Sequence, residues 1–307
     1  VAVAITYLAC NLGFSAAMLN PFTVGIAQSI AGIQLYSGVE FRTLVWFVST
    51  LVGCGFVMFY AMKIKKNPEL SPMFEHDQVK REKLKSTESE HTEFTLRHKI
   101  IIAALFTSIA LVVYGVLKLE FWIPQIAAVF LGLGIISGLV GKLAPNEIAE
   151  AFTDGAKDMI GAAIMIGLAK SVMIIAQNAN IIDTILFNLA NVVGQLPSLI
   201  ASYIMFVIQM FINFFVSSGS GQAALTMPIL APLGDLVGIS RQLSVLIYQL
   251  GDGFSNAMFP TSGVLIACLG MAGVPYGKWL KWILPLQAIL FMTAIVFITI
   301  ASLIGWA

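Results

Sequence analysis

Long apolar stretches alternate with short polar segments along this chain. A helix that spans a bilayer needs about 20 mostly apolar residues. Hydrophobic residues make up 58% of the 307 residues and charged residues 11%, whereas a soluble domain carries roughly 25% charged residues. The sequence therefore predicts an all-α polytopic membrane protein. The stretches long enough to span lie at residues 44–62, 100–117, 123–143, 159–177 and 282–306.

Other apolar stretches are interrupted by small or polar residues. Residues 197–216 and 222–238 flank the run Ser217-Ser218-Gly219-Ser220-Gly221, and each glycine in a helix interior costs about 1 kcal/mol. This pattern predicts a re-entrant helical hairpin with its tip near the bilayer centre. Two pairs of shorter pieces predict two broken helices, at residues 1–12 and 16–33 and at residues 241–250 and 264–271.

A six-residue motif occurs at both predicted helix breaks. It reads GFSAAM from Gly13 and GFSNAM from Gly253, and each copy continues to a proline, a threonine and a glycine. Hydrocarbon does not tolerate unpaired backbone groups, so broken helices persist where they line a polar cavity. The Lys and Arg near the helix ends predict that the two copies cross the membrane in opposite senses. Such an inverted repeat is typical of secondary transporters.

The distribution of charge predicts how the chain is organised. Residues 63–99 hold nine of the 17 Lys and Arg, seven of the 16 Asp and Glu, and all three His. A basic linker of this kind belongs in the cytoplasm, which puts Glu40 and Arg42 at the outer end of the preceding span. The predicted regions are the end of a first inverted repeat with a broken helix and a span (1–62), a cytoplasmic linker (63–99), scaffold helices with an interfacial amphipathic helix (100–158), a transport region (159–281) with a hairpin at 197–239 and a broken helix at 241–273, and a final span (282–307).

Net charge and cysteine content limit the partners and the kinds of site that the sequence indicates. The formal net charge is +1, which gives no indication of a nucleic-acid partner. Cys10, Cys54 and Cys268 are isolated in apolar segments, a pattern that predicts neither a disulfide nor a metal site. The chain opens on Val1 inside an apolar run with no basic segment before it. This opening is not a signal peptide and is typical of a chain whose N-terminal part is missing.

The predicted hairpin tip is the first candidate binding site. Ser217, Ser218 and Ser220 offer hydroxyl groups, while Gly219 and Gly221 let a ligand approach the backbone. The second arm starts at the tip, and the N-terminus of a helix favours a carboxylate. The alternative is close helix packing, which also selects small residues.

The two predicted breaks are the second candidate. Asp252, Ser255, Asn256 and Thr261 provide oxygen atoms suited to sodium and to polar groups of a solute. An acid near membrane depth is usually functional, so Asp252 could carry a coupling proton or pair with an ion, or else lie at the interface as a helix-end residue. The counterparts in the first break are Asn11, Ser15, Asn20 and Thr23.

Lys170 is the one charge inside the predicted span at 159–177. At a rise of 1.5 Å per residue it lies roughly at mid-bilayer, where an unpaired ammonium group is costly. Its partner would be an acid or an anionic substrate. The alternative is a side chain that reaches a polar cavity without any role.

Three segments together resemble a known family. They are Ala151–Leu186, Phe214–Gln242 and Tyr248–Gly263, and they are similar to the YfcC-like branch of the four-carbon dicarboxylate anaerobic carrier (DcuC-like) family of the ion transporter superfamily. The resemblance covers nearly the whole chain apart from the linker. It implies a secondary carrier for dicarboxylates or amino acids, with a scaffold domain, a transport domain, two hairpins and two broken helices, working as a homodimer by an elevator motion.

The resemblance also implies roles for single residues. The three serines of the hairpin tip would bind substrate or ion. Lys170 stands where such relatives carry arginine, and the first hairpin would lie upstream of Val1. The second broken-helix loop would contain Ser255, Asn256, Pro260 and Thr261, and its first-repeat partner would contain Gly13, Ser15, Asn20, Pro21 and Thr23.

These observations predict a secondary active transporter of a small carboxylate-bearing solute, either a dicarboxylate or an amino acid. Transport would be coupled to sodium or protons or would exchange solutes, with no other cofactor. The alternative is a passive channel. An enzyme is not expected, because no His lies in a predicted span and neither G-x-S-x-G nor H-E-x-x-H occurs. We expect a multi-pass protein of the bacterial cytoplasmic (inner) membrane whose partners are the lipid bilayer, the solute and a second copy of the chain.

Overall fold

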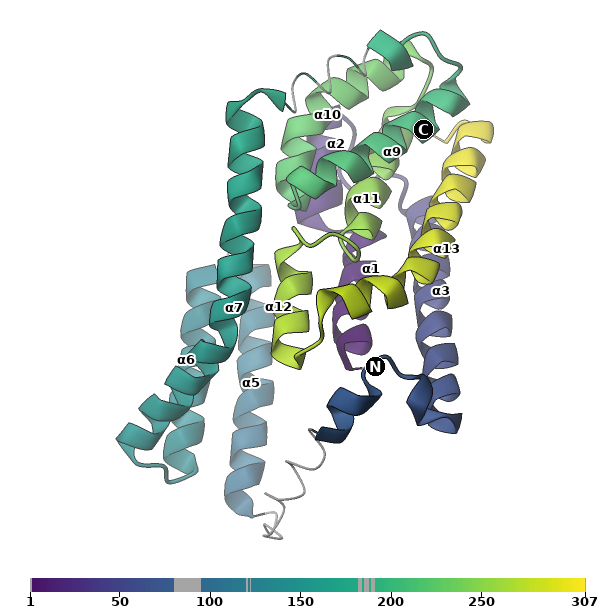
Figure 1. Ribbon diagram of the computed structural model, residues 1–307. Helices are drawn as coiled ribbons and strands as arrows, with labels where there is room; N and C mark the ends of the chain where they lie inside the picture. The colour runs from purple at the N-terminus through teal and green to yellow at the C-terminus, as the bar shows by residue number, and fades with distance from the viewer. Residues whose placement is uncertain are drawn as a thin grey trace. The chain divides into compact units, whose positions relative to one another are not determined.

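The structure is a computed structural model that describes residues 2–79, 95–119, 121, 123–181, 184, 188 and 191–306 (Figure 1). These residues form helices joined by turns, and no β-strand occurs among them. Three helices in this described part are long and apolar enough to cross a membrane, namely α3 (Val39–Lys66), α9 (Ser198–Phe215) and α13 (Tyr276–Leu303). The prediction of an all-α polytopic membrane protein is thereby confirmed.

The chain divides into two compact units, and the smaller one comprises Glu75–Ile160. In it, α5 (Leu96–Lys118) packs against α6 (Ile123–Val140). The ring of Phe121 covers Gly115, where any Cβ atom would collide with it. The predicted linker belongs partly to this unit, and residues 80–94 of it lie outside the described residues.

Helix α7 (Pro145–Asn178) begins in the smaller unit and is one continuous helix. The sequence predicts an interfacial helix that ends at residue 158 and a span that begins at 159. The backbone has no break there, because the segment contains no proline after its first residue and its three glycines, Gly155, Gly161 and Gly167, keep helical geometry.

The larger unit, Val1–Phe74 with Gly161–Ala307, contains the predicted hairpin. Helices α9 and α10 (Gly219–Leu236) pack against each other and are joined by residues 216–218. The connection is shorter than the predicted break at 217–221, since Gly219 and Gly221 lie in the first turn of α10. The penalty for glycine applies to helix interiors. The side chain of Ser218 caps this helix by accepting a hydrogen bond from the backbone N of Gly221 at 3.4 Å.

The second broken helix consists of α11 (Arg241–Ser255) and α12 (Gly263–Ala272), joined by residues 256–262. Its first half is longer than the predicted 241–250, so Asp252 and Ser255 lie in the helix and not in the break. Gly251, directly after the predicted end, lies inside the helix and serves close packing. A Cβ atom at Gly251 would lie 2.5 Å from the Cβ of Gln209 on α9.

The first broken helix has the same plan. A π-helical segment, η1 (Ala4–Leu8), continues into α1 (Ala9–Ser15), and after residues 16–20 the chain resumes as η2 (Pro21–Gly25) and α2 (Ile26–Ala31). Asn20 caps the second half, because its Oδ1 accepts a hydrogen bond from the backbone N of Phe22 at 2.8 Å. Ser15 is the last residue of α1 and is therefore helical, whereas the sequence predicts it in the break.

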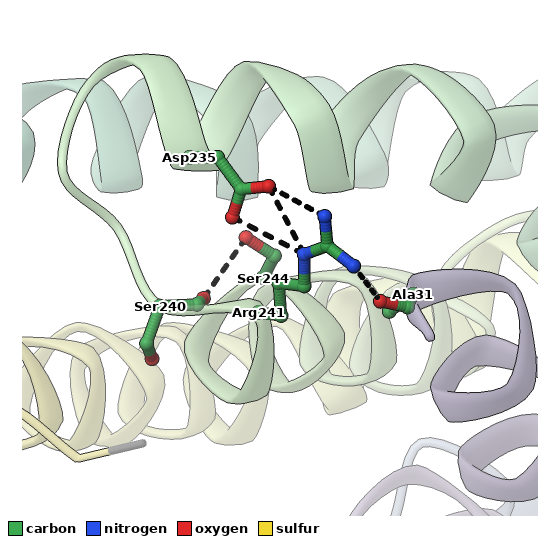
Figure 2. Close-up of polar contacts among 5 residues, drawn as sticks. All are labelled: Ala31, Asp235, Ser240, Arg241 and Ser244. Carbon is green, nitrogen blue, oxygen red and sulfur yellow. Dashed lines mark hydrogen bonds and ion pairs between the residues drawn. The ribbon is translucent and has the colours of Figure 1, made fainter. Parts of the chain in front are cut away.

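Figure 2 shows how α10, α11 and α2 are tied together at one end. Arg241 donates hydrogen bonds to the carboxylate of Asp235 at 2.8–3.3 Å and to the carbonyl oxygen of Ala31 at 2.7 Å. Ser240 caps α11, since its Oγ accepts a hydrogen bond from the backbone N of Leu243 at 3.1 Å. The hairpin and both broken helices are thus held by one cluster of polar contacts.

Candidate functional site

The serine of each repeated motif occupies the same place in its helix. Ser15 is the last residue of α1 and Ser255 is the last residue of α11. Each hydroxyl donates a hydrogen bond to the carbonyl oxygen four residues earlier, at 2.5 Å to Asn11 and at 2.7 Å to Gly251. The sequence repeat is therefore also a repeat of local structure.

The two motifs are in direct contact. A Cβ atom at Gly253 would collide with the Cα and Cβ atoms of Ser15, so α11 approaches α1 as closely as glycine allows. Each break also has a carbonyl group bound by the other broken helix. Tyr7 donates its hydroxyl hydrogen to the carbonyl oxygen of Asn256 at 2.9 Å, and Gln249 donates from Nε2 to that of Ala17 at 2.7 Å.

The hairpin tip contacts both breaks. Ser217 donates a hydrogen bond to the carbonyl oxygen of Thr261 at 2.6 Å. On the other side, a Cβ atom at Gly219 would lie 2.6 Å from Cζ of Phe14 and 2.7 Å from Cγ2 of Thr23. The structure thus brings together the hairpin tip, the first break and the second break, which the sequence analysis selected separately.

Asp252 lies at the centre of this meeting point. Its Oδ2 is 3.3 Å from the position that a Cβ atom at Gly219 would occupy. The side chains of Asp252 and Thr23 are 0% exposed. Among the described residues, neither carboxylate oxygen of Asp252 and not the Oγ1 of Thr23 has a hydrogen-bond partner. The site therefore combines an enclosed acid with an enclosed hydroxyl, both without partners.

The remaining predicted residues have different surroundings. Asn256 accepts a hydrogen bond at Oδ1 from Asn213 at 3.0 Å, and Ser220 is half-buried in the first turn of α10. Lys170 belongs to α7, and its side chain lies outside the described part of the structure. No cluster of three or more His, Cys, Asp or Glu that could hold a metal ion occurs in the described part of the chain.

Two site residues on α9 were missed by the sequence analysis. Asn213 donates from Nδ2 to the carbonyl oxygen of Asp252 and to Oγ of Ser255, both at 2.8 Å. One turn earlier, Gln209 accepts at Oε1 a hydrogen bond from Nε2 of Gln222 at 2.7 Å. The signal was present in the sequence, because two amides four residues apart share one face of an otherwise apolar helix.

Arg42 is buried against the second broken helix, which the sequence does not predict. The sequence predicts Arg42 at the outer end of a span, but the residue is 1% exposed. It donates from Nη1 to Oε1 of Gln249 at 2.7 Å and from Nη2 to Oε1 of Gln242 at 3.3 Å. It also lies 5.4 Å from the centroid of the Trp306 ring. No ion pair of Arg42 with a carboxylate occurs among the described residues. Amide oxygens and an aromatic face, and not water, accommodate this cation.

The substitution Arg42→Met is expected to destabilise the protein by about 3 kcal/mol, because it removes two buried hydrogen bonds from a charged donor. Gln249 would lose the donor that orients its side chain, and with it the hydrogen bond to the first break. Thermal unfolding of the detergent-purified protein measures the effect. Arg97→Met is the matched control, since Arg97 is exposed. Equal unfolding temperatures for the two variants would contradict this role for Arg42.

A hollow of about 460 Å³ borders the first motif. Neither Asp252 nor Thr23 lines this hollow, and both stay buried. The residues that line the hollow are Gly13, Phe14, Ala17, Met18, Leu19, Asn20 and Trp46.

Comparison with known proteins identifies similar sequences. The family model described as "C4-dicarboxylate anaerobic carrier" matches residues 1–303. A protein of Escherichia coli (strain K12) named "Putative basic amino acid antiporter YfcC" is 41% identical over 315 residues, which cover 99% of this chain and 62% of that protein. An uncharacterized protein of Haemophilus influenzae (strain ATCC 51907 / DSM 11121 / KW20 / Rd) is 33% identical over 294 residues, which cover 95% of this chain and 58% of that protein.

The chain thus spans about three fifths of the length of these curated relatives. No solved structure matches it. The family match extends over both motifs, the hairpin tip and the site that they form together. This chain belongs to the C4-dicarboxylate anaerobic carrier family.

Proposed function

We propose that this chain forms the solute site of a secondary active transporter in a bacterial inner membrane. The observation that carries the proposal is the meeting of the hairpin tip with both broken helices around Asp252, in a chain of a carrier family. Broken helices at the interface of two repeats hold solute and coupling ion in secondary transporters. The same chain is not expected to be an enzyme.

The solute that fits is small and carries a carboxylate. Any helix leaves its first N–H groups without an intrahelical partner, and α10 begins with Gly219, Ser220 and Gly221, which have no large side chains. A carboxylate is favoured at such an end by the helix dipole. The description of the family names four-carbon dicarboxylates and the name of one relative mentions basic amino acids, and both classes carry this group.

We further infer an elevator-type motion of a homodimer, coupled to an ion or to exchange of a second solute. The hairpin and both broken helices are joined by Arg241 and by the contact of Gly253 with Ser15. A group of elements held in this way is suited to move as one body. The moving body would then comprise the transport region predicted at 159–281 and the first broken helix, which lies in the predicted region 1–62.

Counterflow in proteoliposomes tests the proposal, with labelled succinate and labelled arginine as probes. A transporter accumulates the labelled probe transiently when the lumen contains the same unlabelled compound. A passive channel, the second candidate, equilibrates the label without accumulation. Absence of counterflow with both probes would contradict secondary transport of these two solute classes.

The substitution Ser218→Leu is expected to abolish this uptake without reducing the amount of protein in the membrane. It replaces the cap of α10 with a bulky side chain at the hairpin tip, next to the proposed carboxylate site. Asn256→Leu is expected to do the same at the second break. Ser29→Leu serves as the control, since Ser29 is exposed on α2. Normal uptake by both site variants would remove the proposed site.

A further inference from the structure

The carboxyl group of Asp252 is buried in a way that disfavours its charged form. Its side chain is 0% exposed and neither of its oxygens has a hydrogen-bond partner among the described residues. Removing an ionised carboxylate from water without a compensating partner is strongly unfavourable. Asp252 must therefore either bind a cation or take up a proton when the hairpin tip closes over it.

No cationic side chain pairs with Asp252 among the described residues. Its neighbour Gly219 contributes only the partial positive charge of the N-terminus of α10. Gly219, the methyl group of Thr23 and the ring of Phe14 surround the same point. Asn213 donates to the backbone carbonyl oxygen of Asp252 and not to its carboxylate. Tyr248, one turn away on α11, donates its hydroxyl hydrogen to the carbonyl oxygen of Gly219 at 2.6 Å.

Titratable and charged groups on the elements that pack against α11 are engaged elsewhere or exposed. Tyr7 is hydrogen-bonded to Asn256, and Tyr203 to Thr299. Tyr276 is hydrogen-bonded to Met258, and Asp235 forms an ion pair with Arg241. Cys10, Lys278 and Lys281 are exposed. Arg42 on α3 is joined to α11 through Gln249, three residues before Asp252 on the same helix.

Sodium is a poorer occupant than a proton. In transporters with broken helices, unwound carbonyl groups coordinate sodium. Here four of the seven carbonyl oxygens of the second break already accept hydrogen bonds from side chains. Those of Asn256, Ala257, Met258 and Thr261 are bound by Tyr7, Trp279, Tyr276 and Ser217.

We propose that Asp252 carries the coupling ion of this transporter as a proton. The inference rests on the proposed transport function. The carboxylate accepts a proton from water on the side where the hairpin tip is open, and the neutral acid is then enclosed. On the other side the O–H bond breaks, the proton passes to water and the carboxylate is restored. Arg42, held next to α11 by Gln242, Gln249 and the ring of Trp306, offsets the negative charge of the open state.

Proton movement in proteoliposomes tests this assignment. The vesicles contain the purified protein and a trapped pH-sensitive dye, and gradients of succinate or arginine are imposed with and without sodium. We expect the wild-type protein to move protons together with whichever probe shows counterflow, independently of sodium. Asp252→Asn is expected to lower this proton movement at least tenfold. The control Asp154→Asn, an exposed carboxyl on α7 paired with Lys157, is expected to keep it.

Proton movement by Asp252→Asn at the wild-type rate would overturn the proposal. So would wild-type transport driven by a sodium gradient without proton movement. If Asp252→Asn fails to fold, as judged by size-exclusion profile and thermal unfolding, the Asp252→Glu variant is measured in its place. Its uptake must then show a pH midpoint different from that of the wild type, and an unchanged midpoint overturns the proposal. Failure of the transport function itself is distinguishable, since the wild-type protein would then show no counterflow.

Discussion

The substitution Gly219→Val is expected to abolish uptake of labelled succinate and arginine. A Cβ atom at this position would lie 2.6 Å from Cζ of Phe14, 2.7 Å from Cγ2 of Thr23 and 3.3 Å from Oδ2 of Asp252. Carbon atoms at such distances repel, so the hairpin tip must withdraw from the first broken helix. Forced overpacking of this kind costs about 1–3 kcal/mol, and the withdrawn tip can no longer enclose Asp252.

Uptake into proteoliposomes, normalised to the amount of reconstituted protein, measures this effect. Gly277→Val is the matched control, because Gly277 also lies in the first turn of a helix and no atom lies within 4 Å of its hypothetical Cβ. We expect the control to transport at the wild-type rate. Wild-type uptake by Gly219→Val would show that the tip does not close against Phe14 and Thr23.

The substitution Gly253→Val is expected to prevent the two broken helices from assembling. A Cβ atom there would collide with the Cα atom of Ser15, which belongs to the backbone and cannot move aside by rotating a side chain. The destabilisation should reach about 3 kcal/mol, the upper end for overpacked sites. The variant should show a lower unfolding temperature and a smaller folded fraction after extraction into detergent.

The matched control for this site is Gly55→Val on α3, where no atom lies within 4 Å of the hypothetical Cβ. Both substitutions add the same side chain to a helical glycine, so the difference between them isolates the contact with Ser15. Removing the hydroxymethyl group by Ser15→Gly in the Gly253→Val background should restore stability only in part, since the clash with Cα remains. Full restoration would contradict the backbone contact.

The helical class and the position of the hairpin follow from the sequence. Apolar stretches of span length separated by charged turns predict a polytopic helical protein, and the cluster of Ser217 to Gly221 marks where α9 gives way to α10. The exact helix ends do not follow, because glycine has two uses. At Gly251 and Gly253 it permits close contact between helices, whereas in the run from Ser217 to Gly221 the sequence predicts that it interrupts a helix.

Some residues of the candidate site could likewise be predicted from the sequence, and others could not. Residues Ser217, Asp252, Thr23 and Thr261 stand out in the sequence, since polar groups within apolar segments are costly and therefore rare. Asn213 was also visible as a polar residue in an apolar helix but was not selected. Arg42 was misread, because a charge at the end of a span is compatible both with solvent and with a buried partner. Only the amides of Gln242 and Gln249 distinguish these cases.

By itself, the sequence determined that this is a helical membrane protein with a hairpin and a repeated break, because local hydrophobicity decides which segments enter lipid. The tertiary structure decided that the two breaks touch, that the hairpin tip lies against both and that Asp252 is left without a partner. These features depend on contacts between different helices. Those with the first broken helix join residues about 200 or more positions apart, such as Gly253 with Ser15 and Gly219 with Thr23. The spacing of residues along one helix carries no information about which distant side chain will pack against it.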